Sequence, residues 1–199
     1  MHGLILKTLQ VFLQDTYGTE IWARIAAAAD LTAPGFEAML NYPEEVFFRV
    51  LDAAGAVLNK PREAILEDVG TYLVSHPNSE GLRRLLRFGG VDFIEFLHSL
   101  DDLPDRARLV VADLVLPDLE LRDLAQNRFH LRITGQLPGF GFALVGLLQA
   151  MADDYGALAL LDLQEAGRDG QVIEITIVEA AYAEGRDFEL AAAPAGGQA

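Results

Sequence analysis

The chain contains no cysteine, only two lysines and no long apolar run. Without cysteine, the sequence excludes disulfides, thiolate nucleophiles, cysteine-type zinc sites and thiolate-ligated cofactors. No apolar segment approaches the roughly 18 residues that a membrane span needs, and the first seven residues resemble no secretory leader. We therefore expect a cytoplasmic protein.

Basic residues are also scarce relative to acidic ones. There are 30 acidic against 15 basic side chains, so the formal net charge is −15. Such a surface repels phosphate backbones and anionic headgroups, which argues against nucleic acid and membrane surfaces as partners. With 199 residues that are 51% hydrophobic, the chain is long enough for one domain or for two small lobes that share a core.

The first half of the chain has the apolar spacing of helices. Gly18 is placed to end the first helix, and Pro43 and Pro61 stand where prolines favour helix starts. The predicted helices cover residues 4–17, 20–29, 43–56, 60–74, 82–88 and 91–103.

The pattern changes after Pro117. Alternation of apolar and polar residues over 119–121 and 129–133, joined by a polar turn at 125–127, predicts a hairpin. Residues 142–155 are helical in period, and 157–164 with 171–178 predict a second hairpin around a turn at 167–170. The fold class is therefore α+β, mostly helical to Leu109 and followed by an antiparallel sheet with one long helix against it.

Six features resemble one family when taken in chain order. The segment Phe96–Pro104 is similar to F-L-x-x-L-D-x-L-H, and Pro117 stands about where the family keeps a proline against its cofactor. The other features are Met1–Ile5 for M-x-G-x-I, Tyr17–Trp22 for Y-G-x-E-x-W, Tyr42 with Leu51 and Gly70, and Leu144–Leu148 for I-x-G-I-I.

Over roughly Met1 to Glu179 the chain therefore resembles the haem-nitric oxide/oxygen binding (H-NOX, HNOB) family. The resemblance implies a helical N-terminal lobe (1–62), an α/β lobe with an antiparallel sheet (63–185) and haem between them. Residues 186–199, rich in small residues, are expected to form a flexible tail.

The sequence departs from the family at the residues that attach haem. The resemblance places the axial histidine at position 104, where this chain has proline. It places the Y-x-S-x-R motif, which holds the propionates, at Ile133, Gly135 and Leu137. Proline has no donor atom for iron, and the three substitutions leave the propionate charges without partners. We expect the fold without haem binding in the family's manner.

None of the four histidines replaces the missing ligand convincingly. His98 lies six residues before Pro104, far round a helix from the ligand face, and is only a weak alternative metal ligand. His130 alternates out of phase with its apolar neighbours, which predicts a solvent-facing side chain. His2 and His76 are expected to be peripheral, and no pair has metal-site spacing.

Catalytic groups are not indicated either. Adjacent acids such as Asp101 with Asp102, or Asp153 with Asp154, do not face one another on a helix, and neither these nor Asp105 has a neighbouring base or nucleophile. The glycine-rich segment 135–142 lacks the lysine and hydroxyl of a phosphate-binding loop. Its apolar character predicts a turn that lines a hydrophobic cavity, although amides at the following helix start could meet a small anion. We predict that the chain is not an enzyme.

Three functions remain open. The first is a sensor or signalling adaptor whose pocket binds another hydrophobic ligand. The second is a ligand-free module that docks on a histidine kinase, a cyclic-nucleotide enzyme or a chemoreceptor, and the third is haem-based gas sensing through a non-standard ligand. By inference from the resemblance, the pocket-lining candidates are Ile5, Leu9, Leu73, Leu97, Leu100, Pro104, Pro117, Ile133, Gly135, Leu137, Ala143 and Leu147.

Overall fold

The computed structural model describes residues 1–33, 35–165 and 170–187. Within these ranges no helix combines the length and the apolar character needed to cross a bilayer. The helical elements are α1 (Gly3–Tyr17), α2 (Thr19–Ala28), α3 (Glu44–Leu58), α4 (Arg62–Ser75), η1 (Pro77–Ser79), α5 (Glu80–Arg87), α6 (Phe93–His98), η2 (Leu100–Asp102), α7 (Leu103–Val110) and α8 (Phe140–Tyr155). The strands are β1 (Asp118–Ala125), β2 (Arg128–Thr134), β3 (Leu158–Glu165) and β4 (Gly170–Glu179).

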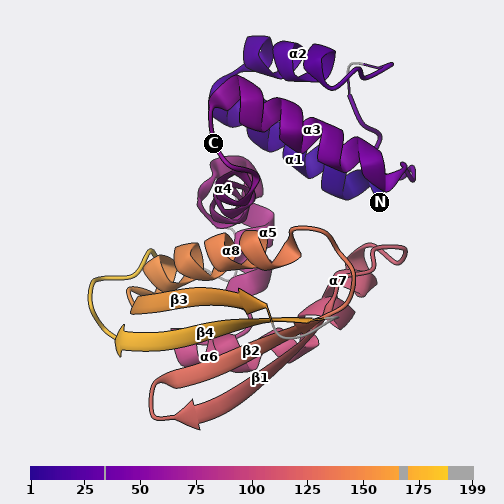
Figure 1. Ribbon diagram of the computed structural model, residues 1–199. Helices are drawn as coiled ribbons and strands as arrows, with labels where there is room; N and C mark the ends of the chain where they lie inside the picture. Colours follow the sequence, from indigo (N-terminus) through magenta and orange to yellow (C-terminus); the bar gives the residue numbers. More distant parts are fainter. Residues whose placement is uncertain (34, 166–169, 188–199) are drawn as a thin grey trace, which may run out of the picture.

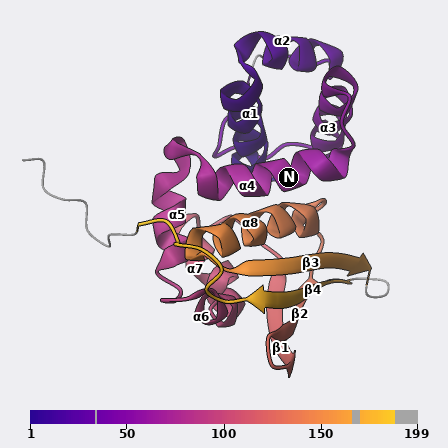
Figure 2. The ribbon, with the colours of Figure 1, turned by 90° about the vertical axis from the view of Figure 1, so that its left-hand side faces the viewer.

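The elements stack in layers, with α1, α2 and α3 at one end and the sheet at the other, where α6 and α7 lie beside it (Figure 1). Helices α1 to α3 form the outer layer, α4 lies beneath them, and α8 lies between α4 and the sheet (Figure 2). The sheet is antiparallel with strand order β1-β2-β4-β3. The α+β class predicted from the sequence is confirmed.

Two hydrophobic cores fill these layers. One is built from α1 to α4 and includes Leu6, Ile25 and Ile65, all fully buried. The other lies around α8 and the sheet and includes Phe96 and Leu148. Because α4 contributes to both cores, the boundary predicted at residues 62–63 falls at the start of the helix that joins the two lobes.

Local sequence explains most of the element ends. Gly18, at a φ of 90°, ends α1 and donates its backbone N–H to the carbonyl of Gln14, as expected for a C-cap glycine. Asn59 ends α3 in the left-handed region. The first hairpin turns at Gln126 and Asn127, where it was predicted. The predicted second hairpin is also present, but its turn at 166–169 lies outside the described residues.

The helix predicted over 91–103 is wrong in its extent. The chain instead forms α6, the short η2 and then α7, which begins at Leu103. Pro104 therefore stands in the first turn of α7 rather than at a helix end. A proline lacks the N–H of a helix interior but suits a first turn, so a new helix starts there.

The end of the described chain is attached to α5 and α8. Arg186 donates its backbone N–H to the carbonyl of Asp154 at 2.9 Å, and the carbonyl of Asp187 accepts from Arg83 at 3.0 Å. These two residues begin the predicted tail, whose remainder, 188–199, lies outside the described residues.

Candidate functional site

Helix α4, which contributes to both cores, makes its closest backbone contact where it crosses α8. A Cβ atom at Gly70 would lie 1.9 Å from the carbonyl oxygen of Ala143, and one at Gly146 would lie 1.9 Å from that of Glu67. The hydroxyl of Thr71 also donates to the carbonyl of Gly146 at 3.3 Å. We call this backbone contact, at Gly70 and Gly146, the seam.

Beside the seam the lobes separate around an apolar hollow of about 340 Å³, here called the cavity. Helix α1 forms one wall, α4 and α5 a second, and α7 and α8 a third. Its volume lies at the lower end of the about 300–1,000 Å³ typical of small-molecule sites. The lining residues are Leu4, Ile5, Thr8, Leu9, Phe47, Leu66, Val69, Leu73, Leu82, Leu85, Leu86, Leu103, Ala107, Val111, Leu114, Leu116, Leu137, Pro138, Gly139, Phe140, Ala143, Leu144 and Leu147.

The chemistry of this lining is almost uniform. Among the described residues that form it, Thr8 has the one polar side chain, and there is no histidine, cysteine, methionine, tyrosine or charged group. Iron in haem proteins takes its axial bond from those side chains, and propionates need cationic or hydrogen-bonding partners. The residues present therefore do not fit a ligated haem held as the family resemblance implies.

The four histidines all lie away from the cavity lining. His2 and His76 each accept a backbone N–H two residues ahead through Nδ1, at 3.2 and 3.3 Å. The half-exposed His98 has Nε2 3.6 Å from a carboxylate oxygen of Asp123. His130 is on β2, opposite Glu174 of β4. Within the described ranges, no cluster of three histidine, aspartate or glutamate side chains could hold a metal ion.

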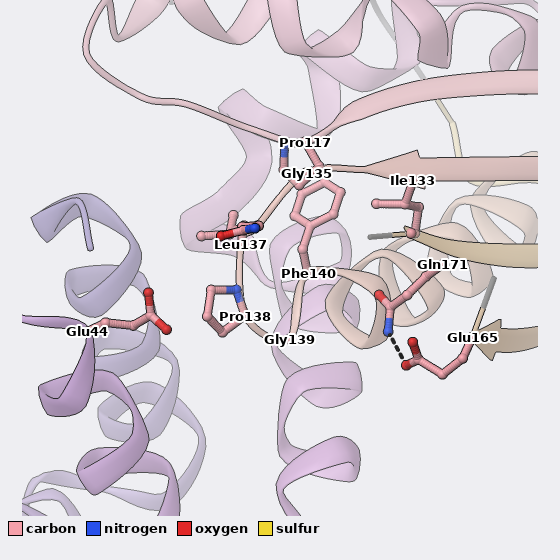
Figure 3. Close-up of a pocket in the computed structure, with 12 residues that line it drawn as sticks. Glu44, Pro117, Ile133, Gly135, Leu137, Pro138, Gly139, Phe140, Glu165 and Gln171 are labelled. Atoms are coloured by element: carbon pink, nitrogen blue, oxygen red, sulfur yellow. Dashed lines mark hydrogen bonds between the residues drawn. The ribbon is translucent and has the colours of Figure 1, made fainter. Parts of the chain in front are cut away.

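A second hollow of about 390 Å³ adjoins the cavity and opens to solvent, and we call it the outer depression (Figure 3). The segment 137–140 lines both hollows, so they are direct neighbours. This segment belongs to the glycine-rich stretch 135–142, for which a cavity-lining turn was predicted. The outer depression is lined by Glu44, Pro117, Ile133, Gly135, Gln136, Leu137, Pro138, Gly139, Phe140, Glu165, Gly170 and Gln171.

Gly135 takes a backbone conformation that suits glycine alone. Its φ is 141°, and a Cβ atom there would lie 3.1 Å from the Cα of Pro117. The serine that the family motif has at this position would therefore be strained. At Gly135 the backbone conformation, as well as the side chain, therefore differs from what the family resemblance implies.

The predicted pocket residues fall into three groups. Pro117, Ile133 and Gly135 line the outer depression, and Leu137 lines both hollows. Those that line the cavity alone are Ile5, Leu9, Leu73, Ala143 and Leu147.

Leu97, Leu100 and Pro104 are buried but line neither hollow, so their predicted placement was wrong. Leu97 and Leu100 are fully buried in the core around α8 and the sheet. Because α7 begins at Leu103, that residue and Ala107, one turn later, reach the cavity, while Pro104 does not.

Sequence reasoning missed several lining residues. Leu82, Leu85 and Leu86 form an i, i+3, i+4 stripe that marks one face of α5, so the signal was present. The segment 111–116, which follows α7, has no such periodicity, and tertiary packing alone brings it to the cavity.

The acidic pairs are structural rather than catalytic in position. Asp154 is 1% exposed, and its Oδ1 lies 2.8 Å from Nε of the buried Arg83. Asp101 accepts the backbone N–H of Leu121 at 2.8 Å, and Asp105 pairs with Arg108 at 2.6 Å. None of these acids lines the cavity.

Comparisons with known proteins agree with this fold. A family model described as Haem-NO-binding (HNOB) matches residues 2–159. Soluble guanylate cyclase 89Da of Drosophila melanogaster is 21% identical over 160 residues, which are 80% of this chain and 24% of that protein. Guanylate cyclase soluble subunit beta-2 of Rattus norvegicus is 26% identical over 126 residues, which are 59% of this chain and 18% of that protein. The chain thus spans about a quarter or less of these curated relatives.

Solved structures give the same result for the fold. The Fe(II) unliganded H-NOX protein from K. algicida has a TM-score of 0.76 at 19% identity, covering 92% of this chain and 100% of that one. The Fe(II)NO form of an H-NOX protein from S. oneidensis has a TM-score of 0.73 at 18% identity, covering 89% and 99%. At these identities the likeness establishes architecture and leaves the ligand open.

Proposed function

Because the chain belongs to the haem-NO-binding (H-NOX) family, whose domains are sensors and not catalysts, we propose that it senses an apolar small molecule other than histidine-ligated haem. The observation that carries this proposal is the apolar cavity, whose described lining has no iron ligand and no cationic partner for a propionate. The family fold is retained while the chemistry that attaches haem is replaced.

The cavity supports a bound ligand over an empty module. An apolar occupant would remove the apolar lining from water, which favours binding by about 25 cal/mol per Å² of apolar surface buried. The ligand-free alternative would be supported by aromatic side chains that fill the hollow. Phe140 lines it without closing it, and Phe142 packs against the N-terminal core instead.

The relatives support a signalling partner. The matched proteins are named as soluble guanylate cyclases, and this chain corresponds to a small part of each. We propose that occupancy of the cavity changes the packing between the lobes and is read by a cyclic-nucleotide enzyme, a histidine kinase or a chemoreceptor.

The test is a titration of the purified chain with the neutral apolar fluorophore N-phenylnaphthylamine. We expect saturable fluorescence enhancement from one site. An Ala107→Phe substitution places a ring in the cavity and should abolish it, because Ala107 is part of the lining. The matched control is Ala28→Phe, on the exposed face of α2, which should bind as the unsubstituted chain does. Absence of binding, or equal binding by the Ala107→Phe protein, would overturn the proposal.

A further inference from the structure

We infer that the ligand is an amphiphile with a cationic head, whose tail occupies the cavity and whose head lies in the outer depression. This inference rests on the proposed function and adds the chemical class of the ligand. Its first support is that the two hollows adjoin the same segment, since Leu137 and Phe140 line both. The inferred ligand has its tail and its head on the two sides of this segment.

The second support is the charge of the outer depression. Its two charged lining residues in the described chain are Glu44 and Glu165, and both are acidic. They approach from opposite sides, Glu44 from the start of α3 and Glu165 from the end of β3 (Figure 3). Among the described residues, Glu44 has no ion-pair partner, so a bound cation would not have to displace one.

Amide groups complete the polar part of this surface. Gln171 donates from Nε2 to Glu165 at 3.0 Å, and this bond holds that carboxylate at the edge of the hollow (Figure 3). Gln136 is exposed on the same rim. Carboxylate and amide oxygens accept hydrogen bonds, so an ammonium head with its N–H donors matches what they offer.

This arrangement reverses the charge preference that the family resemblance implies. The family motif has an arginine at the position of Leu137, where it would hold an anionic propionate. Here that position is apolar, and the nearest described charges in the outer depression are negative. An anionic head would meet repulsion from Glu44 and Glu165, whereas a cationic head would meet attraction.

The experiment measures displacement of N-phenylnaphthylamine by three compounds with one chain length: decylamine, decanol and decanoate. At neutral pH and low salt we expect decylamine to bind about tenfold more tightly than decanoate, with decanol between them, because exposed carboxylates contribute only modest energies. Added salt should shrink the difference.

The variants assign the effect to the two carboxylates. The Glu44→Gln, Glu165→Gln double variant should bring the amine and the carboxylate to within about twofold of each other. The matched control, Glu20→Gln with Glu179→Gln, removes the same charge at exposed sites outside both hollows and should retain the preference.

The outcomes separate this inference from the proposed function. If decanol displaces the probe but decanoate binds as well as decylamine, the inference is overturned and the apolar cavity ligand stands. If the control double variant loses the preference as fully as the Glu44, Glu165 variant, the two carboxylates are not its cause and the inference fails. If none of the three compounds displaces the probe, and the probe itself does not bind, the proposed function fails with it.

Discussion

The two lobes are joined in two contrasting ways. At the seam, Gly70 and Gly146 let backbone touch backbone, with no room for a single methyl group. The backbone of Ala143 and Leu147 takes part in this contact with Gly70, yet both residues also line a cavity of about 340 Å³. The contrast indicates that the seam sets the spacing of the lobes, so that the hollow beside it cannot close by a simple approach of α1 toward α8.

The far end of α8 is fixed as well. The buried pair of Asp154 and Arg83 ties α8 to α5, and α5 supplies a wall of the cavity through Leu82 and Leu86. Helix α8 is therefore attached on two sides of the hollow that it lines. The seam and the pair of Asp154 with Arg83 thus keep the cavity between them from closing.

Loss of the Asp154–Arg83 pair, near the C-terminal end of α8, should have the largest effect on stability. Asp154→Ala removes the buried carboxylate that pairs with Arg83 and leaves it the more exposed carboxylate of Glu80, and removal of one partner from a buried pair costs about 3–5 kcal/mol. Urea unfolding followed by circular dichroism measures the loss. The adjacent Asp153 is exposed, so Asp153→Ala should change stability by less than about 0.5 kcal/mol. Equal losses from the two variants would show that the pair does not anchor α8.

A side chain added at the seam should have the next largest effect on stability. Gly146→Ala forces its new methyl group against the carbonyl of Glu67, and such overpacking costs about 1–3 kcal/mol or more. A Cβ atom at Gly81, in α5, would meet no other part of the described chain within 4 Å, so Gly81→Ala should leave stability unchanged or raise it by up to about 1 kcal/mol. Thermal unfolding of the two variants checks this. If the Gly146→Ala protein is as stable as the Gly81→Ala protein, the backbone contact at the seam does not set the spacing of the lobes.

Filling the cavity should have a smaller effect, and it should stabilise the protein. Ala107→Leu adds apolar atoms to the cavity and should raise the free energy of unfolding by about 1 kcal/mol. The same substitution at Ala150, which is packed in the core around α8 and the sheet, should lower it by about 1–3 kcal/mol. If both substitutions destabilise equally, the hollow has no free space to fill.

The smallest effect concerns α1, which forms the cavity wall opposite α8. The Tyr72 hydroxyl donates to Asp15 at 2.6 Å and Asn78 donates at 2.9 Å, and these bonds lower the pKa of Asp15 below its ordinary 3.8. Burial, with the same hydrogen bond, raises the pKa of Tyr72 to about 12.

Because the pKa of Asp15 is lowered in the folded state, its contribution to stability is present above about pH 4 and is lost as the pH falls through the lowered value. Asp15→Asn should therefore be less stable than the unsubstituted chain at neutral pH, with a difference that shrinks in acid. Thermal melting across a pH series measures it. A difference that does not change with pH would mean that the carboxylate charge plays no part.

Most of the fold could be predicted because its signals are local. The spacing of apolar residues, with a helix-ending glycine at Gly18 and a helix-starting proline at Pro43, located the first helices. The alternation of apolar and polar residues located both hairpins. Pro104 misled the prediction, because a proline after an apolar helical stretch marks either the end of one helix or the start of another. In the structure it marks a start, since α7 begins at Leu103.

The site could be predicted less completely. Ile5, Leu9, Leu73, Ala143 and Leu147 were found through the family resemblance, which carries tertiary information that periodicity lacks. Glu44 and Glu165 belong to elements far apart in the sequence, and only the folded arrangement places them on one hollow. Their charge, which underlies the inferred ligand class, could not be assigned to a site from the sequence.

The central claim is that the family fold persists here without the family's attachment of haem. A titration of the purified chain with haem, followed by visible absorption before and after addition of nitric oxide, tests it most directly. The account predicts no sharp Soret band that saturates at one haem per chain and no shift with nitric oxide, because the described lining of the cavity has neither an axial ligand nor a cationic partner for the propionates. A stoichiometric Soret band that shifts with nitric oxide would contradict it.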